Sequence, residues 1–262
     1  MELTVAGKQA RATTGGRPLD PDSPLLVFIH GAGMDRTLWQ LQTRYFANHG
    51  WSVLAVDLPG HGGSAGPPPD SIHGYADWVA ELIPAAGFSA ASVVGHSMGS
   101  FIGLHLAAHH PDRVDRLALL GTAAAMPVHP ELLAAARADD PLAFELVTCW
   151  SLTRRSQLGG HQTPGLWMSA ESVRLLEHMP AGVLGNDLQA CDSYSEAAKT
   201  AAEVTCPVLL LLGELDIMTR PAAARPLAAA LHDSTTVILP GAGHLMMIEQ
   251  PDPVIDTLAD FL

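Results

Sequence analysis

Cysteine and positive charge are scarce in this 262-residue chain. The three cysteines, Cys149, Cys191 and Cys206, are widely spaced and form no Cys-x-x-Cys motif, which indicates reduced thiols in a cytoplasmic protein and no disulfide framework. Lys and Arg number 14 against 27 Asp and Glu, a net charge of −13. Because an acidic surface repels phosphate backbones and anionic lipid headgroups, we expect neither nucleic acid nor membrane as a partner.

Long apolar runs are missing as well. No stretch of about 18 uncharged apolar residues is present to cross a bilayer. The N-terminus lacks a basic region followed by an apolar run, so we expect no signal peptide. Even so, 48% of the residues are hydrophobic and only 16% are charged, which is sufficient for a large core. The length fits one large α/β domain with an insertion, or at most two domains.

Short apolar runs alternate with helical segments over the first 121 residues. Continuous runs at 25–29 and 52–56 predict strands that are buried on both faces. Between them we expect a helix over 37–49, with Thr37 as its N-cap and Gly50 at its end. The alternation predicts a parallel sheet covered by helices. The other elements expected here are a hairpin (2–6 and 9–14), helices at 72–86 and up to residue 110, and strands before residue 95 and at 116–121.

The alternation lapses after residue 121. Residues 122–203 contain no convincing strand, and we interpret them as a helical cap that lies over the C-terminal edge of the sheet. The core domain is then formed by residues 1–121 and 204–262. Helices are expected in the cap at 130–138, 141–150, 170–178 and 183–200. After the cap, strands are expected at 208–213 and 235–239, and helices at 221–231 and from residue 253.

A Gly-x-Ser-x-Gly motif stands between an apolar strand and a helix, as Gly95-His96-Ser97-Met98-Gly99. This context is the one that a nucleophile elbow requires, because the serine must occupy a tight strand-to-helix turn. Gly95 and Gly99 carry no Cβ that would collide with the neighbouring backbone. Ser97 is therefore expected at the C-terminal sheet edge, where ligands bind in open α/β sheets.

A serine nucleophile needs a base, and the base needs an orienting acid. Asp216 follows the strand at 208–213 and His244 follows the strand at 235–239, in the chain order of the elbow enzymes. Glu214 is the alternative acid, but it lies two residues earlier, back along the strand end. Three further histidines are expected to support the backbone near these motifs: His30, His61 and His96.

A metal or cofactor site has little support. His105, His109 and His110 have spacing that brings histidines to one helix face, but no Cys or carboxylate set accompanies them. We therefore expect a solvated helix end and no metal. The glycine-rich pattern at 60–65 is followed by prolines where a dinucleotide site would begin a helix, so we expect no cofactor.

Together these motifs resemble the α/β-hydrolase superfamily, and within it small capped carboxylesterases of the pimeloyl-acyl-carrier-protein methyl esterase type. The resemblance implies Ser97 as nucleophile, Asp216 as acid and His244 as base. It also implies an oxyanion hole made by the backbone N–H groups of Ala32 and Met98. The motifs that carry it are His30-Gly31-Ala32-Gly33, Asp57-Leu58-Pro59-Gly60-His61-Gly62, the elbow, Gly213-Glu214-Leu215-Asp216 and Gly241-Ala242-Gly243-His244.

A serine at the elbow predicts acyl transfer and excludes relatives that use an aspartate nucleophile. We expect hydrolysis of a small-to-medium apolar carboxylic ester through an acyl-enzyme on Ser97, by a monomer or homodimer. The large apolar residues expected to line its pocket are Trp39, Trp150, Trp167 and Met246. One alternative is C–C bond hydrolysis of a ring-cleavage product, with Arg154, Arg155 or Arg174 binding its carboxylate. The other is a non-enzymatic small-molecule receptor on the same fold.

Overall fold

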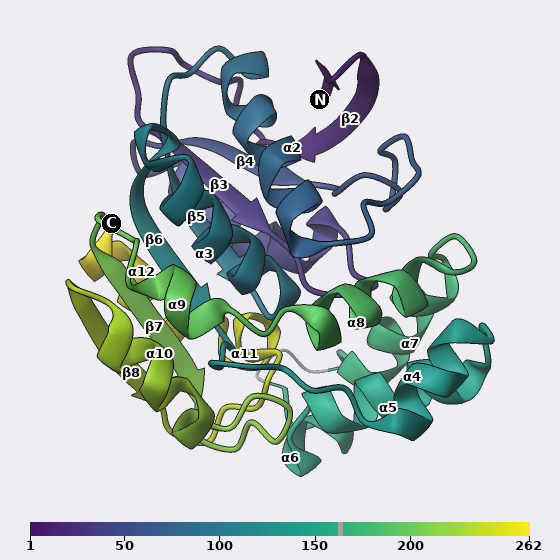
Figure 1. Cartoon of the computed structure of the whole chain (residues 1–262). Coiled ribbons are helices and arrows are strands. Elements are labelled where there is room, and N and C mark those ends of the chain that lie inside the picture. Colours follow the sequence, from purple (N-terminus) through teal and green to yellow (C-terminus); the bar gives the residue numbers. More distant parts are fainter. Residues whose placement is uncertain (162–164) are drawn as a thin grey trace.

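The computed structural model describes residues 1–161 and 165–262. Its centre is an eight-stranded sheet in the order β1-β2-β4-β3-β5-β6-β7-β8 (Figure 1). The strand β2 pairs antiparallel with β1 and β4, and all other neighbours are parallel. The predicted, mostly parallel sheet is thus confirmed. The strands are β1 (Glu2–Val5), β2 (Lys8–Thr13), β3 (Leu25–Ile29), β4 (Ser52–Val56), β5 (Ala91–His96), β6 (Val114–Leu120), β7 (Val208–Gly213) and β8 (Ser234–Leu239).

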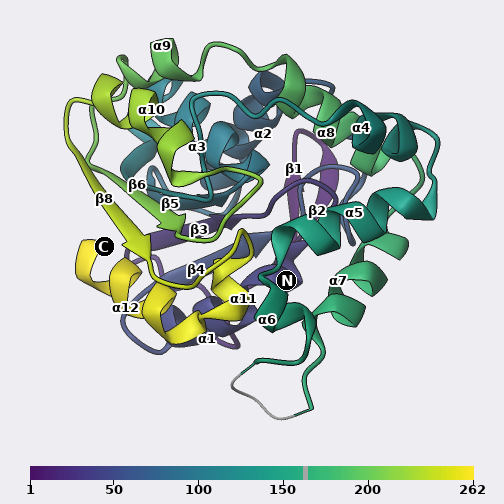
Figure 2. The ribbon, with the colours of Figure 1, turned by 90° about the horizontal axis from the view of Figure 1, so that it is seen from below.

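Helices cover both faces of this sheet, as the continuous apolar strands require. Every residue of β3, β4, β5 and β7 is buried. Figure 2 shows α2, α3, α9 and α10 on one face and α1 and α12 on the other. These helices are α1 (Gln40–Ala47), α2 (Ile72–Ala85), α3 (Met98–His109), α9 (Ala197–Ala201), α10 (Arg225–Ala230) and α12 (Pro251–Phe261).

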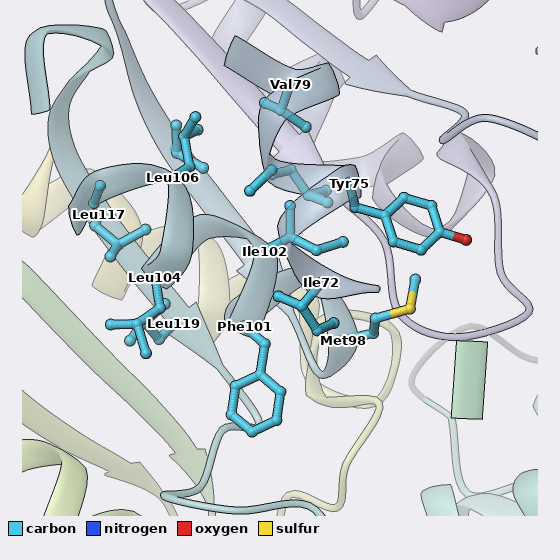
Figure 3. Close-up of a cluster of buried hydrophobic side chains, with 14 of the residues drawn as sticks. Ile72, Tyr75, Val79, Met98, Phe101, Ile102, Leu104, Leu106, Leu117 and Leu119 are labelled. Atoms are coloured by element: carbon cyan, nitrogen blue, oxygen red, sulfur yellow. The ribbon is translucent and has the colours of Figure 1, made fainter. Parts of the chain in front are cut away.

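The helix α3 is enclosed along most of its length. Its residues from Met98 to Leu106 are all buried, and apolar side chains of α2, α3 and β6 form one cluster around it (Figure 3). Each fully buried Leu, Ile or Phe side chain stabilises the fold by roughly 1.5–3 kcal/mol. The position of the elbow at the start of α3 is therefore fixed by the core.

A helical insertion joins β6 to β7. Figure 1 shows α4, α5, α7 and α8 grouped beyond the carboxyl ends of the strands. The prediction of one helix over 183–200 is wrong, because the chain leaves helical geometry at Tyr194, whose ring is buried against Phe101 at 4.9 Å between centroids. Residues 162–164 of the predicted cap lie outside the described residues, and its bounds stay a prediction. The helices are α4 (Pro130–Arg137), α5 (Pro141–Ser151), α6 (Arg154–Gln157), α7 (Met168–Glu177) and α8 (Val183–Ser193).

Some helix boundaries also differ from expectation. The helix predicted at 37–49 begins as a 3₁₀ turn, η1 (Arg36–Trp39), and its N-cap is Asp35 and not Thr37. Asp35 Oδ1 accepts the Thr37 N–H at 2.7 Å. Within the described residues, none of the helices has the length and apolar character needed to cross a membrane. Further short helices are η2 (Pro111–Arg113), η3 (Pro221–Ala224) and α11 (Met246–Glu249).

Candidate active site

Ser97 occupies a sharp turn between β5 and α3. Its backbone has φ 53° and ψ −116°, a left-handed conformation that costs a non-glycine residue about 1–3 kcal/mol. A Cβ added at Gly95 would lie 2.1 Å from the Gly99 carbonyl oxygen, and one added at Gly99 would lie 2.4 Å from that of Ile29. Only glycine fits at these two positions, which explains the Gly-x-Ser-x-Gly sequence. The strained serine is typical of a functional turn.

The side chains of His244 and Asp216 meet near the ends of β8 and β7. His244 Nδ1 lies 2.7 Å from Asp216 Oδ2, and both residues are 2% exposed. Burial raises the pKa of Asp216, but His244 and the hydrogen bonds from Thr219 lower it to a net value below 3.8. The carboxylate is therefore charged. Because it can only accept, we assign the proton to Nδ1 of His244.

In the neutral ring, this proton assignment leaves Nε2 of His244 as an acceptor. Nε2 is buried and has no hydrogen-bond partner within the described part of the chain. His244 and Ser97 both line one cavity of about 330 Å³. A buried imidazole nitrogen without a partner, in a residue that lines the same cavity as a serine, is suited to accept a proton. The structure thus brings Ser97, Asp216 and His244 to the same sheet edge.

Thr219 completes the surroundings of Asp216 and was not predicted from the sequence. Its N–H and that of Met218 donate to Asp216 Oδ1, both at 2.8 Å, and its hydroxyl donates to Oδ2 at 2.7 Å. An aspartate that accepts from backbone N–H groups two and three residues later is a common turn. Asp-x-x-Thr was therefore the signal in the sequence.

The backbone near Ala32 is held by two donors to the Gly31 carbonyl oxygen. They are the Met34 N–H, at 3.2 Å, and Nδ1 of His30, at 2.9 Å. Burial and the nearby charge of His61 lower the pKa of His30 to about 3, so this ring is neutral. Its Nε2 accepts the Leu58 N–H, which places the proton on Nδ1. In a trans peptide the N–H points opposite to the C=O, so the Ala32 N–H is directed away from these anchors.

The peptide after Ser97 is arranged in the same way. The Ser97 carbonyl oxygen accepts the Ser100 N–H at 2.9 Å and the Ser100 hydroxyl at 2.6 Å. The Met98 N–H is thus directed away from these donors, at the positive end of α3. Neither this N–H nor that of Ala32 donates to another described residue. Both are free to bind an oxyanion, the role that the resemblance implies.

His96 and Glu214 support the backbone around this site. His96 Nε2 donates to the His244 carbonyl oxygen at 3.0 Å, and burial together with the His244 ring lowers the pKa of His96, which is neutral. The expected supporting roles of His30 and His96 are confirmed. Glu214 is exposed and accepts the Gly241 N–H at 2.8 Å. It caps a turn and makes no described contact with His244, so its geometry does not fit the acid.

The cavity lining differs from the predicted pocket. Trp150 lines the cavity, but Trp39, Trp167 and Met246 lie outside the described lining, which corrects these three expectations. Trp39 is fully buried and packs on Phe28, with ring centroids 5.0 Å apart. Met246 is fully buried in the same core cluster, whereas Trp167 is 61% exposed. The cap and the segment after Asp216 supply other lining residues, among them Met126, Leu132, Leu184, Ile217 and Arg220.

The histidines considered for a metal do not converge. His109 stacks on His105 at 3.9 Å, but His110 pairs with Asp77 at 2.9 Å. Instead, the ligand atoms of His73, His105 and Glu196 lie within 4.8 Å of one another, and these residues could hold a metal. The rings of His73 and His105 are stacked, however, so their in-plane lone pairs run side by side. None of the three residues lines the active-site cavity as described.

Comparison with known proteins agrees with this architecture. Residues 24–251 match the family described as alpha/beta hydrolase fold, so the chain belongs to the α/β-hydrolase family. Pimeloyl-[acyl-carrier protein] methyl ester esterase of Chromobacterium violaceum is 33% identical over 255 residues, which cover 91% of this chain and 94% of that protein. (E)-2-((N-methylformamido)methylene)succinate hydrolase of Acinetobacter baylyi is 26% identical over 246 residues, 90% of this chain and 89% of that one.

Among solved structures, the enol-lactonase from Burkholderia xenovorans has a TM-score of 0.88 at 26% identity. The alignment covers 100% of this chain and 99% of the enol-lactonase. The protein is thus similar over nearly its whole length to hydrolases that are named for different substrates. It is a hydrolase of the α/β fold and resembles esterases.

Proposed function

We propose that the protein is a serine esterase that cleaves a small-to-medium apolar carboxylic ester through an acyl-enzyme on Ser97. One observation carries this proposal. His244 and Ser97 line the same cavity, the Nε2 atom of His244 is buried without a partner among the described residues, and its Nδ1 is hydrogen-bonded to a charged Asp216. This is the arrangement that turns a serine hydroxyl into a nucleophile. The esterase relative at 33% identity supports the same reaction class.

The proposed reaction uses each group in turn. Ser97 Oγ attacks the ester carbonyl carbon while His244 Nε2 takes its proton, and Asp216 stabilises the resulting imidazolium. The N–H groups of Ala32 and Met98 bind the oxyanion of the tetrahedral intermediate. Loss of one such donor typically lowers kcat by about 10²–10³-fold. The imidazolium then protonates the leaving alcohol, and a water molecule, deprotonated by His244, releases the acid and regenerates Ser97.

The cavity sets the size of the acyl group. Its volume is about 330 Å³, and apolar side chains such as Leu132, Val147 and Trp150 line it. Each methylene group buried there favours binding by roughly 0.8 kcal/mol until the cavity is full. We therefore expect the rate to rise with acyl length and then to fall.

A series of p-nitrophenyl esters from acetate to laurate tests this function. kcat/KM should pass through a maximum at short-to-medium acyl chains. A fluorophosphonate should label Ser97, and Ser97→Ala should abolish turnover and labelling with the fold intact. The exposed Ser195 offers a matched control, because Ser195→Ala should change neither. An adduct on another residue, or a preference that rises without limit at lipid interfaces, would refute the proposal.

C–C bond hydrolysis stays a second candidate because of Arg220. The three arginines first considered, Arg154, Arg155 and Arg174, lie outside the described lining, but Arg220 belongs to it. Arg220 has no ion-pair partner within the described residues, so it is available to a substrate carboxylate. A carboxylate-bearing ring-cleavage product, assayed beside the ester series, separates the two reactions. Faster turnover of that product would favour C–C hydrolysis.

A further inference from the structure

A second buried His–Asp pair lies next to the oxyanion loop, defined here as residues 30–34. His61 Nε2 lies 2.7 Å from Asp187 Oδ2, and both residues are fully buried. His61 belongs to the loop after β4, whereas Asp187 comes from α8 in the helical insertion. The pair therefore connects the insertion to the core. Neither residue lines the active-site cavity as described.

The carboxylate of Asp187 is surrounded by donors. Its Oδ2 also accepts the Gly33 N–H at 2.9 Å, and its Oδ1 accepts the Tyr75 hydroxyl at 2.6 Å. Figure 3 shows the Tyr75 ring among apolar side chains, with its hydroxyl directed away from them. Burial raises the pKa of Asp187, but His61 and these hydrogen bonds lower it to a net value below 3.8. Asp187 is thus a buried, fully hydrogen-bonded anion.

His61 is the cation that balances it. Its Nε2 faces the carboxylate, and its Nδ1 lies 3.1 Å from the Pro59 carbonyl oxygen. Both partners can only accept, so both ring nitrogens carry protons. Burial lowers the pKa of His61, but Asp187 and the Pro59 carbonyl raise it to a net value above 6.5. No ring nitrogen is left for proton transfer, so this pair is not a second catalytic dyad.

Gly33 connects the His61–Asp187 pair to the oxyanion loop, because its N–H donates to Asp187. It directly follows Ala32 and has φ +64°, and a Cβ added to it would lie 2.8 Å from Leu184 of α8 and 2.9 Å from Leu176 of α7. The insertion thus packs directly on this glycine. Ala32 lies between two fixed groups, the Gly31 carbonyl oxygen and the Gly33 N–H. The orientation of the Ala32 N–H therefore depends on both anchors, and Asp187 supplies the second.

We propose that Asp187 is a positioning residue that ties the seating of α8 to the geometry of the oxyanion hole. This inference rests on the proposed esterase function. One of the two anchors beside Ala32, the acceptor of the Gly33 N–H, is carried by the insertion and not by the core, so the oxyanion hole is complete only while α8 is seated. Asp187 acts through the Gly33 N–H and does not touch the substrate.

Kinetics of three variants separate positioning from stability. Asp187→Ala removes the acceptor of Gly33 and should lower kcat about 10²-fold, the range for loss of an oxyanion donor, with KM changed less than about threefold. Asp187→Asn keeps an oxygen for Gly33 and should restore kcat to within about tenfold of the wild type. Tyr75→Phe removes the donor to the other carboxylate oxygen, so it should lower thermal stability and leave kcat near the wild-type value.

A double variant covers the case in which Asp187→Ala leaves His61 as an unpaired cation and does not fold. Asp187→Ala/His61→Leu removes both charges, a change that buried ion pairs often tolerate. It should recover stability but not kcat, because Gly33 still lacks its acceptor. A folded double variant with wild-type kcat, or a loss of kcat in Tyr75→Phe as large as in Asp187→Ala, would overturn the proposal.

Amide hydrogen exchange at Gly33, followed by NMR of the ¹⁵N-labelled full chain, is independent of turnover. The Gly33 amide should be protected in the wild type and in Asp187→Asn, and unprotected in the double variant. Equal protection in all three would also overturn the positioning role. If the wild type hydrolyses no ester while Gly33 behaves as expected, the esterase function is what fails.

Discussion

The pairs His244–Asp216 and His61–Asp187 both join an imidazole nitrogen to an aspartate Oδ2 at 2.7 Å, through Nδ1 in His244 and Nε2 in His61. Both are buried, and in both the net pKa of the aspartate is lowered. They differ in the second ring nitrogen. Nδ1 of His61 is hydrogen-bonded to the Pro59 carbonyl oxygen, whereas Nε2 of His244 has no hydrogen-bond partner among the described residues.

This difference separates a proton carrier from a structural ion pair. An imidazole with both nitrogens bound to acceptors keeps two protons and can exchange neither without breaking a buried contact. An imidazole with one free nitrogen can accept a proton from a hydroxyl group in the same cavity. A buried His–Asp contact therefore does not identify an active site unless the other nitrogen is available.

The test with the largest expected effect replaces the aspartate of each pair by asparagine and compares the two losses of kcat. Asp216→Asn should lower kcat by ~10⁴-fold, the loss known for the equivalent change in a serine protease, because an amide can hold the wrong tautomer and cannot stabilise the imidazolium. Asp187→Asn should lower kcat by less than about tenfold, because its oxygen still accepts the Gly33 N–H. Steady-state kinetics on one p-nitrophenyl ester measures both. If the two variants lost activity equally, the distinction between the pairs would not hold.

The sequence predicted one of these pairs and not the other, for a physical reason. Ser97, Asp216 and His244 follow strands of a parallel sheet, and parallel register brings all such ends to one edge. Asp187 lies on a helix of the insertion, 126 residues from His61, and no strand alternation fixes where that helix packs. Nothing in the sequence around Asp187 distinguishes it from a solvent-exposed aspartate.

Pocket residues were hard to predict for a related reason. Trp39 is close to the oxyanion motif in the sequence, but its ring packs in the core against Phe28. Trp150 reaches the cavity from α5 in the insertion. Proximity along the chain places a residue near a strand end, but the direction of its side chain is decided by tertiary packing. The fold and the three strand-end residues are therefore readable from pattern, whereas the lining is not.

For stability the order of the two pairs should be reversed: the loss of His61 should destabilise the protein more than the loss of His244. His61→Leu leaves Asp187 without its counterion, and breaking a buried ion pair typically costs about 3–5 kcal/mol. His244→Leu should cost under about 2 kcal/mol. It removes the hydrogen bond to Asp216 and a longer contact with the Thr219 hydroxyl, together with a buried nitrogen that has no partner, while Asp216 keeps the donors of Met218 and Thr219. Urea unfolding at pH 6 compares the two. Equal losses would mean that His61 carries no charge.

The smallest expected effect is the dependence of stability on pH. Its sign follows from the pKa shifts of His61 and Asp187. The pKa of His61 is raised above 6.5, so its contribution to stability is complete below pH 6.5 and is lost as the pH rises through the folded-state value. The pKa of Asp187 is lowered below 3.8, so its contribution is present above pH 3.8 and is lost as the pH falls through the folded-state value. The pair should therefore stabilise the protein most between these limits. His30, next to His61, has a pKa of about 3 and does not titrate there.

Asp187→Asn weakens this dependence, because Asp187 is the group that raises the His61 pKa most. The free energy of unfolding of the wild type, minus that of the variant, should fall as the pH rises above 6.5. The slope for one proton is at most about 1.4 kcal/mol per pH unit, which is the upper limit of the fall between pH 6.5 and 7.5. Tyr75→Phe retains both charges and should follow the wild-type slope. A difference that stays flat or rises above pH 6.5 would show that His61 is neutral, and the contrast with His244 would then rest on hydrogen bonding alone.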